Sequence, residues 1–179
     1  DEIQTRNFDT LVELIAPSKD DVIIDNGASS FVPLTHYLIS NQVPALLLEM
    51  GHEMVVHTVI TGSQALLDTV SGFAQLASQF PAEALFVVWL NPFWGSIEHE
   101  GKSFEQMKAY TANKARVSAI VNIPALKEDT YGRDLSDMLQ ERLTFDEALA
   151  MDSLTIMTRQ RLKIVKAQLF SQLDSAAVL

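Results

Sequence analysis

Asp25 is the residue whose type and position in this sequence most strongly suggest chemistry. It ends the run Val22-Ile23-Ile24 and is followed by Asn26-Gly27. Because the run is β-branched and lacks polar alternation, it predicts a strand over Val22–Asp25 that is buried on both faces. Open parallel sheets bind ligands at the carboxyl ends of their strands, where a carboxylate could hold Mg²⁺ through water beside a triphosphate. The alternative is a turn residue that caps the next helix, a position that Asp often occupies.

The residues after Asp25 could complete an anion site. Gly27, Ser29 and Ser30 precede a predicted helix, and the backbone N–H groups at a helix start attract anions. The same residues could equally form a plain loop. Both interpretations remain open from the local sequence.

Asn91 is a second candidate, because it ends another predicted buried strand, Leu85–Leu90. Its carboxamide can donate and accept hydrogen bonds together, which suits the edge of an adenine base. The alternative is a turn residue in front of Pro92, and the local sequence alone favours this alternative. Phe93 and Trp94 could pack on a base or simply cover the edge of the sheet.

Two other patterns resemble known motifs but fail on spacing. A P-loop at Gly101-Lys102-Ser103 would require glycine at position 96, which is Ser96, and two nearby glutamates would repel phosphate. We therefore expect a helix start there. His52 and His57 are five residues apart, whereas the zinc-protease helix motif needs a separation of four. The sequence therefore does not indicate a zinc site.

The charge distribution restricts the partners. A net charge of −10 argues against broad contact with nucleic-acid phosphates. Lys and Arg are absent between Asp20 and Gly101, so a cation that contacts phosphates beside Asp25 must come from elsewhere. A group of basic residues lies on the last predicted helix, at Arg159, Arg161, Lys163 and Lys166. This group favours a solvated basic face over a surface that contacts a partner protein or DNA.

The elements expected around these residues alternate between helix and strand, which predicts an α/β fold with a mainly parallel sheet. The expected strands are Val22–Asp25, Met54–Ile60, Leu85–Leu90 and Val117–Ile123. The expected helices are Asn7–Ala16, Phe31–Ser40, one that ends near Phe80, Ser103–Arg116 and Ser153–Leu173, while Gln42–Gly51 is ambiguous. Thr144 and Glu147 have the spacing of a capping box.

The length and composition predict one domain over residues 1–179. The chain is 47% hydrophobic, which is enough for one sizeable core. It has no apolar run long enough for a transmembrane segment. The absence of cysteine suits a cytoplasmic protein.

These motifs together resemble the ParA/MinD-like branch of the P-loop ATPases, in which one strand ends in Asp, a later strand in Asn and a final strand near Ile-Pro. This sequence supplies Val22–Asp25, then Leu85–Asn91, then Ile123-Pro124, in that order. Over nearly its full length it is also similar to the TraL-type conjugal-transfer proteins of plasmids. That similarity is strongest over Arg6–Ser30, Asn91–Arg116 and Leu143–Leu173.

The resemblance implies a doubly wound, P-loop NTPase-like fold that binds ATP and Mg²⁺. Asp25 would lie beside the Mg²⁺ and the attacking water, and Gly27 near the γ-phosphate. Asn91 would contact adenine, and Pro124 would help to close the base pocket. The resemblance also implies a homodimer formed around ATP, with other conjugal-transfer proteins as partners.

This sequence departs from those families at its N-terminal side. The glycine-rich loop with its lysines, and the strands that flank it, do not occur in residues 1–179. The usual Asp-Thr-Pro-Pro is replaced by Asp25-Asn26-Gly27-Ala28. We therefore expect an N-terminally truncated ATPase domain that is inactive alone. The alternatives are a non-catalytic α/β interaction module of the transfer machinery, and an unrelated enzyme that uses Asp25 as a base.

Overall fold

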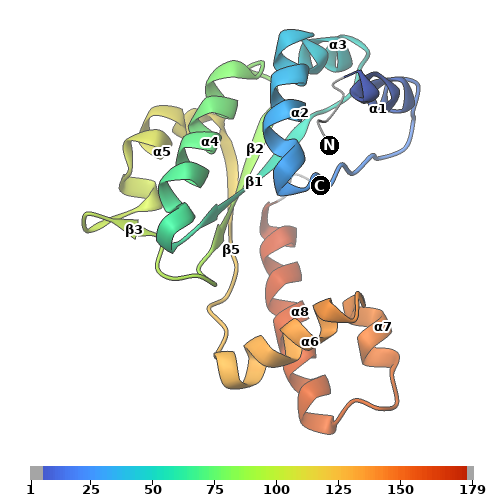
Figure 1. Ribbon diagram of the computed structural model, residues 1–179, viewed down its shortest axis with the longest axis vertical. Coiled ribbons are helices and arrows are strands. Elements are labelled where there is room, and N and C mark those ends of the chain that lie inside the picture. Colours follow the sequence, from blue (N-terminus) through green and yellow to red (C-terminus); the bar gives the residue numbers. More distant parts are fainter. Residues whose placement is uncertain (1–5, 177–179) are drawn as a thin grey trace.

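A small parallel sheet forms the centre of the computed structural model, which describes residues 6–176. The strands β1 (Val55–Thr61), β2 (Leu85–Asn91) and β5 (Val117–Asn122) lie in the order β1-β2-β5 (Figure 1). The expected α/β class and parallel sheet are therefore confirmed, and these strands match their predicted ranges to within one residue. The doubly wound, P-loop NTPase-like arrangement stays a prediction.

One face of the sheet carries the main hydrophobic core. The helices α2 (Ala28–Ser40), α4 (Leu66–Gln79) and α5 (Lys108–Asn113) contribute to it. Side chains alternate along a strand, so the even-numbered residues of β2 point into this core. Phe86 and Val88 are fully buried there, and the ring of Phe86 meets that of Phe73 on α4 edge-on.

The N-terminal helices form a second, smaller core. α1 (Asn7–Ile15) and α3 (Val43–Glu49) pack against Tyr37 of α2. The hydroxyl of Tyr37 donates a 2.6 Å hydrogen bond to Oδ1 of Asp9. That bond raises the pKa of Tyr37 to about 12, and burial of the ring adds to the effect. The predicted helices at Asn7–Ala16 and Phe31–Ser40 are confirmed by α1 and α2, and the ambiguous segment Gln42–Gly51 contains α3.

The predicted buried strand at Val22–Asp25 is wrong. Residues 21–27 form no helix or strand and are exposed to solvent. The side chain of Ile23 is 93% exposed, and those of Val22 and Ile24 are 47% exposed. An apolar run becomes a strand only where another strand pairs with it. Within residues 6–176, the sheet ends at β1 and provides no such neighbour.

The segment around Gly101 differs from the single helix predicted at Ser103–Arg116. It begins with a hairpin of β3 (Glu98–His99) and β4 (Lys102–Ser103), whose turn residues Glu100 and Gly101 both have positive φ. Gly101 therefore serves a tight hairpin turn, where such φ values favour glycine. A 3-10 turn over Phe104–Gln106 follows, and α5 begins only after Met107, which has an extended backbone. Burial of Phe104 and Met107 in the main core accompanies this break in the predicted helix.

After the sheet, a helical unit is formed by α6 (Arg133–Gln140), α7 (Phe145–Ala150) and the first half of α8 (Ile156–Ala176). In Figure 1 this unit lies beyond the carboxyl ends of the strands, and α8 connects it back to the sheet. The capping box is confirmed, because Thr144 and Glu147 exchange backbone and side-chain hydrogen bonds at the start of α7. The last predicted helix is confirmed by α8. Within the described residues, no helix combines the length and apolar character needed to cross a bilayer.

Candidate functional site

The carboxyl ends of the strands bring two of the predicted site residues to the same edge. Asn91 ends β2, and the backbone N–H of Ile123 donates a 2.9 Å hydrogen bond to the carbonyl of Leu90. This bond holds the segment after β5 against the end of β2. Pro124, which follows Ile123 and is half-buried, therefore lies at the same edge of the sheet as Asn91.

The side chain of Asn91 is engaged in its own loop. Its Oδ1 accepts a hydrogen bond of 3.1 Å from the backbone N–H of Phe93. This is the turn role that the local sequence favours. Phe93 and Trp94, which follow, are 66% and 68% exposed and meet edge-on with their ring centroids 4.7 Å apart. The two aromatic rings therefore face solvent and do not cover the sheet.

Asp25 and Gly27 lie in the exposed stretch that leads into α2. Gly27 is the residue before α2, and its carbonyl accepts hydrogen bonds from the backbone N–H and the hydroxyl of Ser30. Its φ of −68° needs no glycine, and an added Cβ would approach only Ser30 Oγ, at 4.0 Å. Figure 1 shows α2 starting on the side of the molecule at which the strands end. The assignments of Asp25 and Gly27 to Mg²⁺ and phosphate stay predictions.

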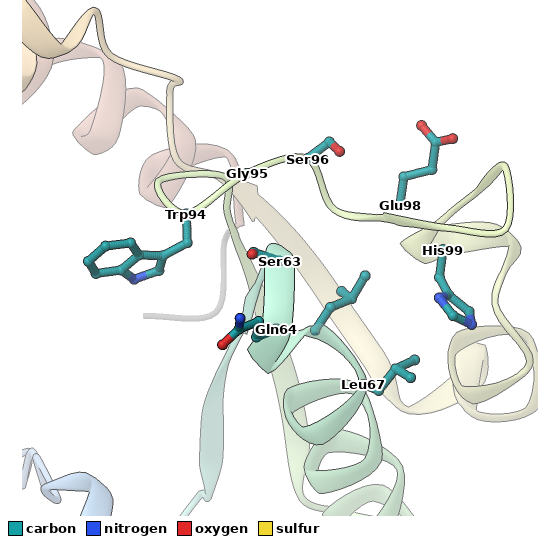
Figure 2. A pocket seen from close by; sticks show the side chains of 9 residues that line it. Ser63, Gln64, Leu67, Trp94, Gly95, Ser96, Glu98 and His99 are labelled. Carbon is teal, nitrogen blue, oxygen red and sulfur yellow. The ribbon is translucent and has the colours of Figure 1, made fainter.

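An open hollow of about 510 Å³ lies between the loops that follow β1 and β2. Figure 2 shows Trp94 on one side of it and Glu98 with His99 on the other, with Ser63 between them. The complete lining is Ser63, Gln64, Leu66, Leu67, Trp94, Gly95, Ser96, Glu98 and His99. Hydroxyl, amide and carboxylate groups are present, while this lining includes no lysine or arginine. A phosphate in the hollow would therefore meet hydroxyl, amide and carboxylate groups but neither lysine nor arginine.

The two loops around the hollow approach each other closely at Gly62 and Gly95. A Cβ added to buried Gly62 would lie 2.1 Å from the carbonyl oxygen of Gly95, which is a severe clash. Gly95 has a φ of +137°, and Ser63 has a φ of +63°, which is unusual for a residue with a side chain. This hollow was not predicted from the sequence. The sequence feature that could have indicated it is a glycine shortly after each of two neighbouring strands.

The two histidines of the rejected zinc motif have separate partners. Nε2 of His52 is 3.0 Å from the carbonyl oxygen of Ala16, in the chain after α1. Nδ1 of His57 accepts a 2.9 Å hydrogen bond from the indole N–H of Trp89. Partial burial lowers the pKa of His57 below its usual value. The two rings therefore serve different packing contacts.

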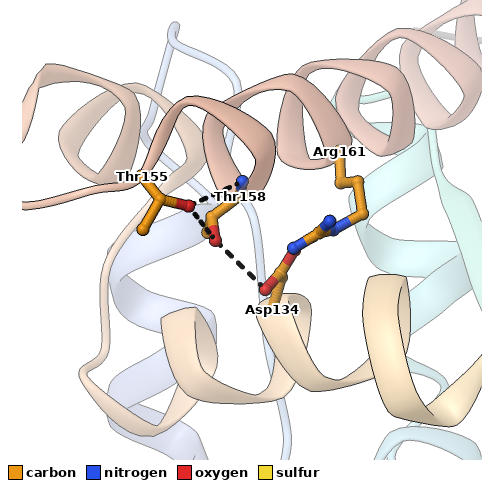
Figure 3. A network of polar contacts seen from close by, with 4 residues as sticks. All are labelled: Asp134, Thr155, Thr158 and Arg161. Atoms are coloured by element: carbon orange, nitrogen blue, oxygen red, sulfur yellow. Dashed lines mark hydrogen bonds and ion pairs between the residues drawn. The ribbon is translucent and has the colours of Figure 1, made fainter.

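Most of the basic residues on α8 hold the helical unit together. Arg159 donates to the carbonyl oxygens of Leu149 and Met151. Figure 3 shows Arg161 paired with Asp134 of α6, whose other oxygen accepts from Thr158. Lys166 forms an ion pair with Asp146 of α7, and Lys163 is exposed. These contacts give the cluster a structural role within the chain. Contact with DNA or a partner protein stays untested.

Comparison with known proteins places this chain in a family. No family model matches the sequence, and no solved structure matches it. Two curated Escherichia coli proteins, each named Protein TraL, match all 179 residues at 86% and 80% identity. The chain spans 74% of the length of each. Identity at this level over the whole chain shows common ancestry, and the chain therefore belongs to the TraL protein family.

Proposed function

We propose that the longer TraL protein represented by this chain acts in plasmid conjugal transfer as an ATP-binding and hydrolysing switch of the ParA/MinD-like type. The observation that supports the proposal is that predicted site residues lie at the edge of the sheet where the strands end. Asn91 and Pro124 lie at this edge, and α2, which follows Asp25, begins on the same side of the molecule. Nucleotide sites of parallel α/β proteins lie at this edge.

In this proposal each predicted residue has one role. Asp25 holds Mg²⁺, through water, next to the attacking water, and Gly27 lies near the γ-phosphate. Asn91 and Pro124 contact adenine. A glycine-rich loop with lysine, from residues of the longer protein outside this chain, supplies most phosphate contacts in a doubly wound fold. Hydrolysis switches a homodimer, or its contact with other conjugal-transfer proteins, in the cytoplasm.

A second candidate function is a non-catalytic interaction module of the transfer machinery. The observation that favours it is the hydrogen bond between Asn91 Oδ1 and the N–H of Phe93, because it occupies the oxygen that would contact adenine. The exposed rings of Phe93 and Trp94 offer apolar surface to a protein partner. In this case the fold would serve transfer without nucleotide.

The two candidates are separated by measuring ATP and Mg²⁺ binding with calorimetry, and phosphate release, in the longer protein. We expect Asp25→Ala to lower turnover at least tenfold and Asn91→Ala to weaken ATP affinity. Asp21→Ala is the matched control, because Asp21 is an exposed aspartate in the same stretch. The added methyl group of Gly27→Ala fits the folded backbone. Any loss of turnover in this variant would therefore indicate a disturbed contact with the phosphate. A longer protein that binds no ATP supports the interaction module instead.

A further inference from the structure

An Asn-Gly pair occurs once in the sequence, at Asn26 and Gly27, in the exposed stretch that leads into α2. The side-chain amide of Asn26 has a carbonyl carbon, Cγ, that a backbone nitrogen can attack. The nitrogen of the following residue is the one that can close a cyclic imide with Cγ. Glycine hinders this attack least, because it has no Cβ and the least restricted backbone.

The structure leaves both reacting groups of this pair accessible. Asn26 lies outside helix and strand and is exposed to water. Its side chain folds towards the next residue, with Nδ2 3.5 Å from the carbonyl oxygen of Gly27. Among residues 6–176, the backbone N–H of Gly27 finds no hydrogen-bond acceptor. A Cβ at Gly27 would meet only Ser30 Oγ, at 4.0 Å, so the space beside the attacking nitrogen is open.

The two asparagines at the ends of strands lack a free nitrogen in the next residue. Asn91 precedes Pro92, whose nitrogen carries no hydrogen and cannot form the imide. Asn122 precedes Ile123, whose N–H donates to the carbonyl oxygen of Leu90 and is held in that bond. Neither asparagine is therefore arranged for the reaction.

The three asparagines on helices have side chains directed away from the next residue. Asn7 begins α1, and side chains on a helix tilt towards its N-terminal end. The amide nitrogens of Asn41 and Asn113 donate to backbone carbonyl oxygens one helical turn earlier in the chain. Asn26 is therefore set apart from the other asparagines by structure as well as by sequence.

We propose that Asn26 is a site of spontaneous deamidation in the longer TraL protein. The nitrogen of Gly27 forms a bond to Cγ of Asn26, and the bond between Cγ and Nδ2 breaks. The leaving amide takes the hydrogen that Gly27 gives up and departs as ammonia. Water then opens the cyclic imide at either carbonyl carbon, which leaves aspartate or isoaspartate at position 26. The reaction consumes only water, needs no nucleotide and stands apart from the proposed ATPase activity.

The product changes the stretch before α2 in charge and in backbone length. Both products add a carboxylate, ionised at neutral pH, directly after Asp25. The sequence offers it no nearby cation, because Lys and Arg are absent between Asp20 and Gly101. Isoaspartate also inserts an extra carbon atom into the backbone immediately before Gly27. Deamidated protein is therefore more negative and is separable from the parent protein by ion exchange.

The test follows the longer TraL protein during incubation without nucleotide at mildly alkaline pH. Mass spectrometry of peptides, prepared by digestion at acidic pH, measures the converted fraction of each asparagine. Labelling by a protein isoaspartate methyltransferase detects the isoaspartate product. Asn113 and Asn122 in the same sample are internal controls, and a synthetic peptide of residues 20–31 gives the rate in an unfolded chain.

We expect Asn26 to be converted at least tenfold faster than Asn113 or Asn122, with isoaspartate among the products. Its rate in the folded protein should lie within tenfold of the rate in the peptide. A larger deficit in the folded protein overturns the proposal, because the fold would then hold the two reacting groups apart. Equal conversion of the three asparagines also overturns it.

Gly27→Ala tests the attacking nitrogen. The methyl group fits the folded backbone, but a Cβ beside the nitrogen hinders its attack. We expect at least tenfold slower conversion of Asn26 in this variant and an unchanged rate in Ser29→Ala, the matched control at an exposed position nearby. An unchanged rate in Gly27→Ala overturns the proposal, because the imide would then not form through this nitrogen.

The comparison of asparagines in the unmodified protein decides the matter in the event that Gly27→Ala does not fold. The outcome is also separate from that of the proposed function. Deamidation of a protein that binds no ATP would refute only the proposed function, and ATP binding without deamidation would refute only this inference.

Discussion

The indole N–H of Trp89 donates a 2.9 Å hydrogen bond to Nδ1 of His57 and thereby joins the side chains of neighbouring strands. An accepting Nδ1 carries no proton, so protonation of the imidazole breaks the bond. Burial of part of the ring lowers the pKa of His57 below its usual value near 6.5. In the unfolded chain the same histidine therefore takes up its proton at higher pH. Protonation of His57 therefore lowers the free energy of unfolding as the pH falls below about 6.5.

The first prediction concerns this pair. In a Trp94→Phe background, Trp89 is the only tryptophan of the chain, and its fluorescence reports on the bond to His57. We expect a fluorescence change on acidification with a midpoint below pH 6.5. His57→Gln, whose amide oxygen can accept the same hydrogen bond without titrating, should abolish the change. A midpoint above 6.5, or a change that persists in His57→Gln, would contradict the assignment.

The second prediction concerns the phenol of Tyr37. Because Tyr37 donates to the carboxylate of Asp9, its pKa is raised to about 12 in the folded protein. The folded pKa lies above the unfolded value, so the stabilisation is present below pH 10 and is lost as the pH rises towards 12. Tyr37→Phe should lower the free energy of unfolding by about 1.5 kcal/mol at pH 7.

Urea denaturation of Tyr37→Phe at pH 7 measures that cost, and ultraviolet absorbance of the phenolates follows the titration. Tyr131→Phe is a suitable comparison, because Tyr131 lies in a different part of the chain, next to α6. If Tyr37→Phe and the unmodified protein unfold at the same urea concentration, the bond to Asp9 does not stabilise the N-terminal helices.

The third prediction concerns the glycine contact beside the hollow. Gly62→Ala places a methyl group 2.1 Å from the carbonyl oxygen of Gly95, so the two loops must separate. We expect a loss of stability of about 2 kcal/mol, since the surrounding backbone must move. Gly27→Ala is the matched control, because its nearest neighbour would be 4.0 Å away. Thermal unfolding of the two variants should differ clearly, and equal melting temperatures would refute the close contact.

The fourth prediction concerns Arg116, which closes the connection between α4 and β2. Its guanidinium donates to backbone carbonyls in the last turn of α4 and on that connection, and it lies 5.2 Å from the centroid of the Phe86 ring. The carbonyls are those of Ala77, Phe80, Pro81 and Ala84. Lysine keeps the charge but loses the planar fork, so Arg116→Lys should cost about 2 kcal/mol.

Chemical denaturation compares Arg116→Lys with Arg133→Lys, because Arg133 is exposed at the start of α6. We expect the midpoint to shift only for Arg116→Lys. A similar shift in both variants would mean that the carbonyl contacts of Arg116 contribute nothing specific.

The strands of the sheet could be predicted because each carries its own signal. Leu85–Leu90 is an apolar run that ends at Asn91, and Val117–Ile123 is a mainly apolar run that ends at Pro124. Parallel strands that are buried on both faces show such runs. Val22–Asp25 has the same local signal, and yet it is exposed. A strand also depends on a neighbour in the sheet, and a local run of residues does not contain that information.

The hollow and the helical unit could not be predicted for a different reason. The contact of Gly62 with Gly95 joins loops about thirty residues apart, and the sequence shows only two glycines that are common in any loop. The basic residues of α8 suggested a solvated face, whereas Arg159 and Arg161 bond to groups on α7, α6 and their connections. Charge on a helix does not reveal which neighbours the helix will have.

The length of α8 has a mechanical consequence. This helix is continuous over 21 residues, which is about 31 Å at a rise of 1.5 Å per residue. Leu162, in its first half, packs in the helical unit, and Gln172, near its end, accepts a hydrogen bond from the N–H of Asn122 at the end of β5. One continuous helix therefore contacts both the helical unit and the sheet. If a partner tilted the helical unit, α8 would move with it, and the end of β5 that is bonded to Gln172 would be displaced.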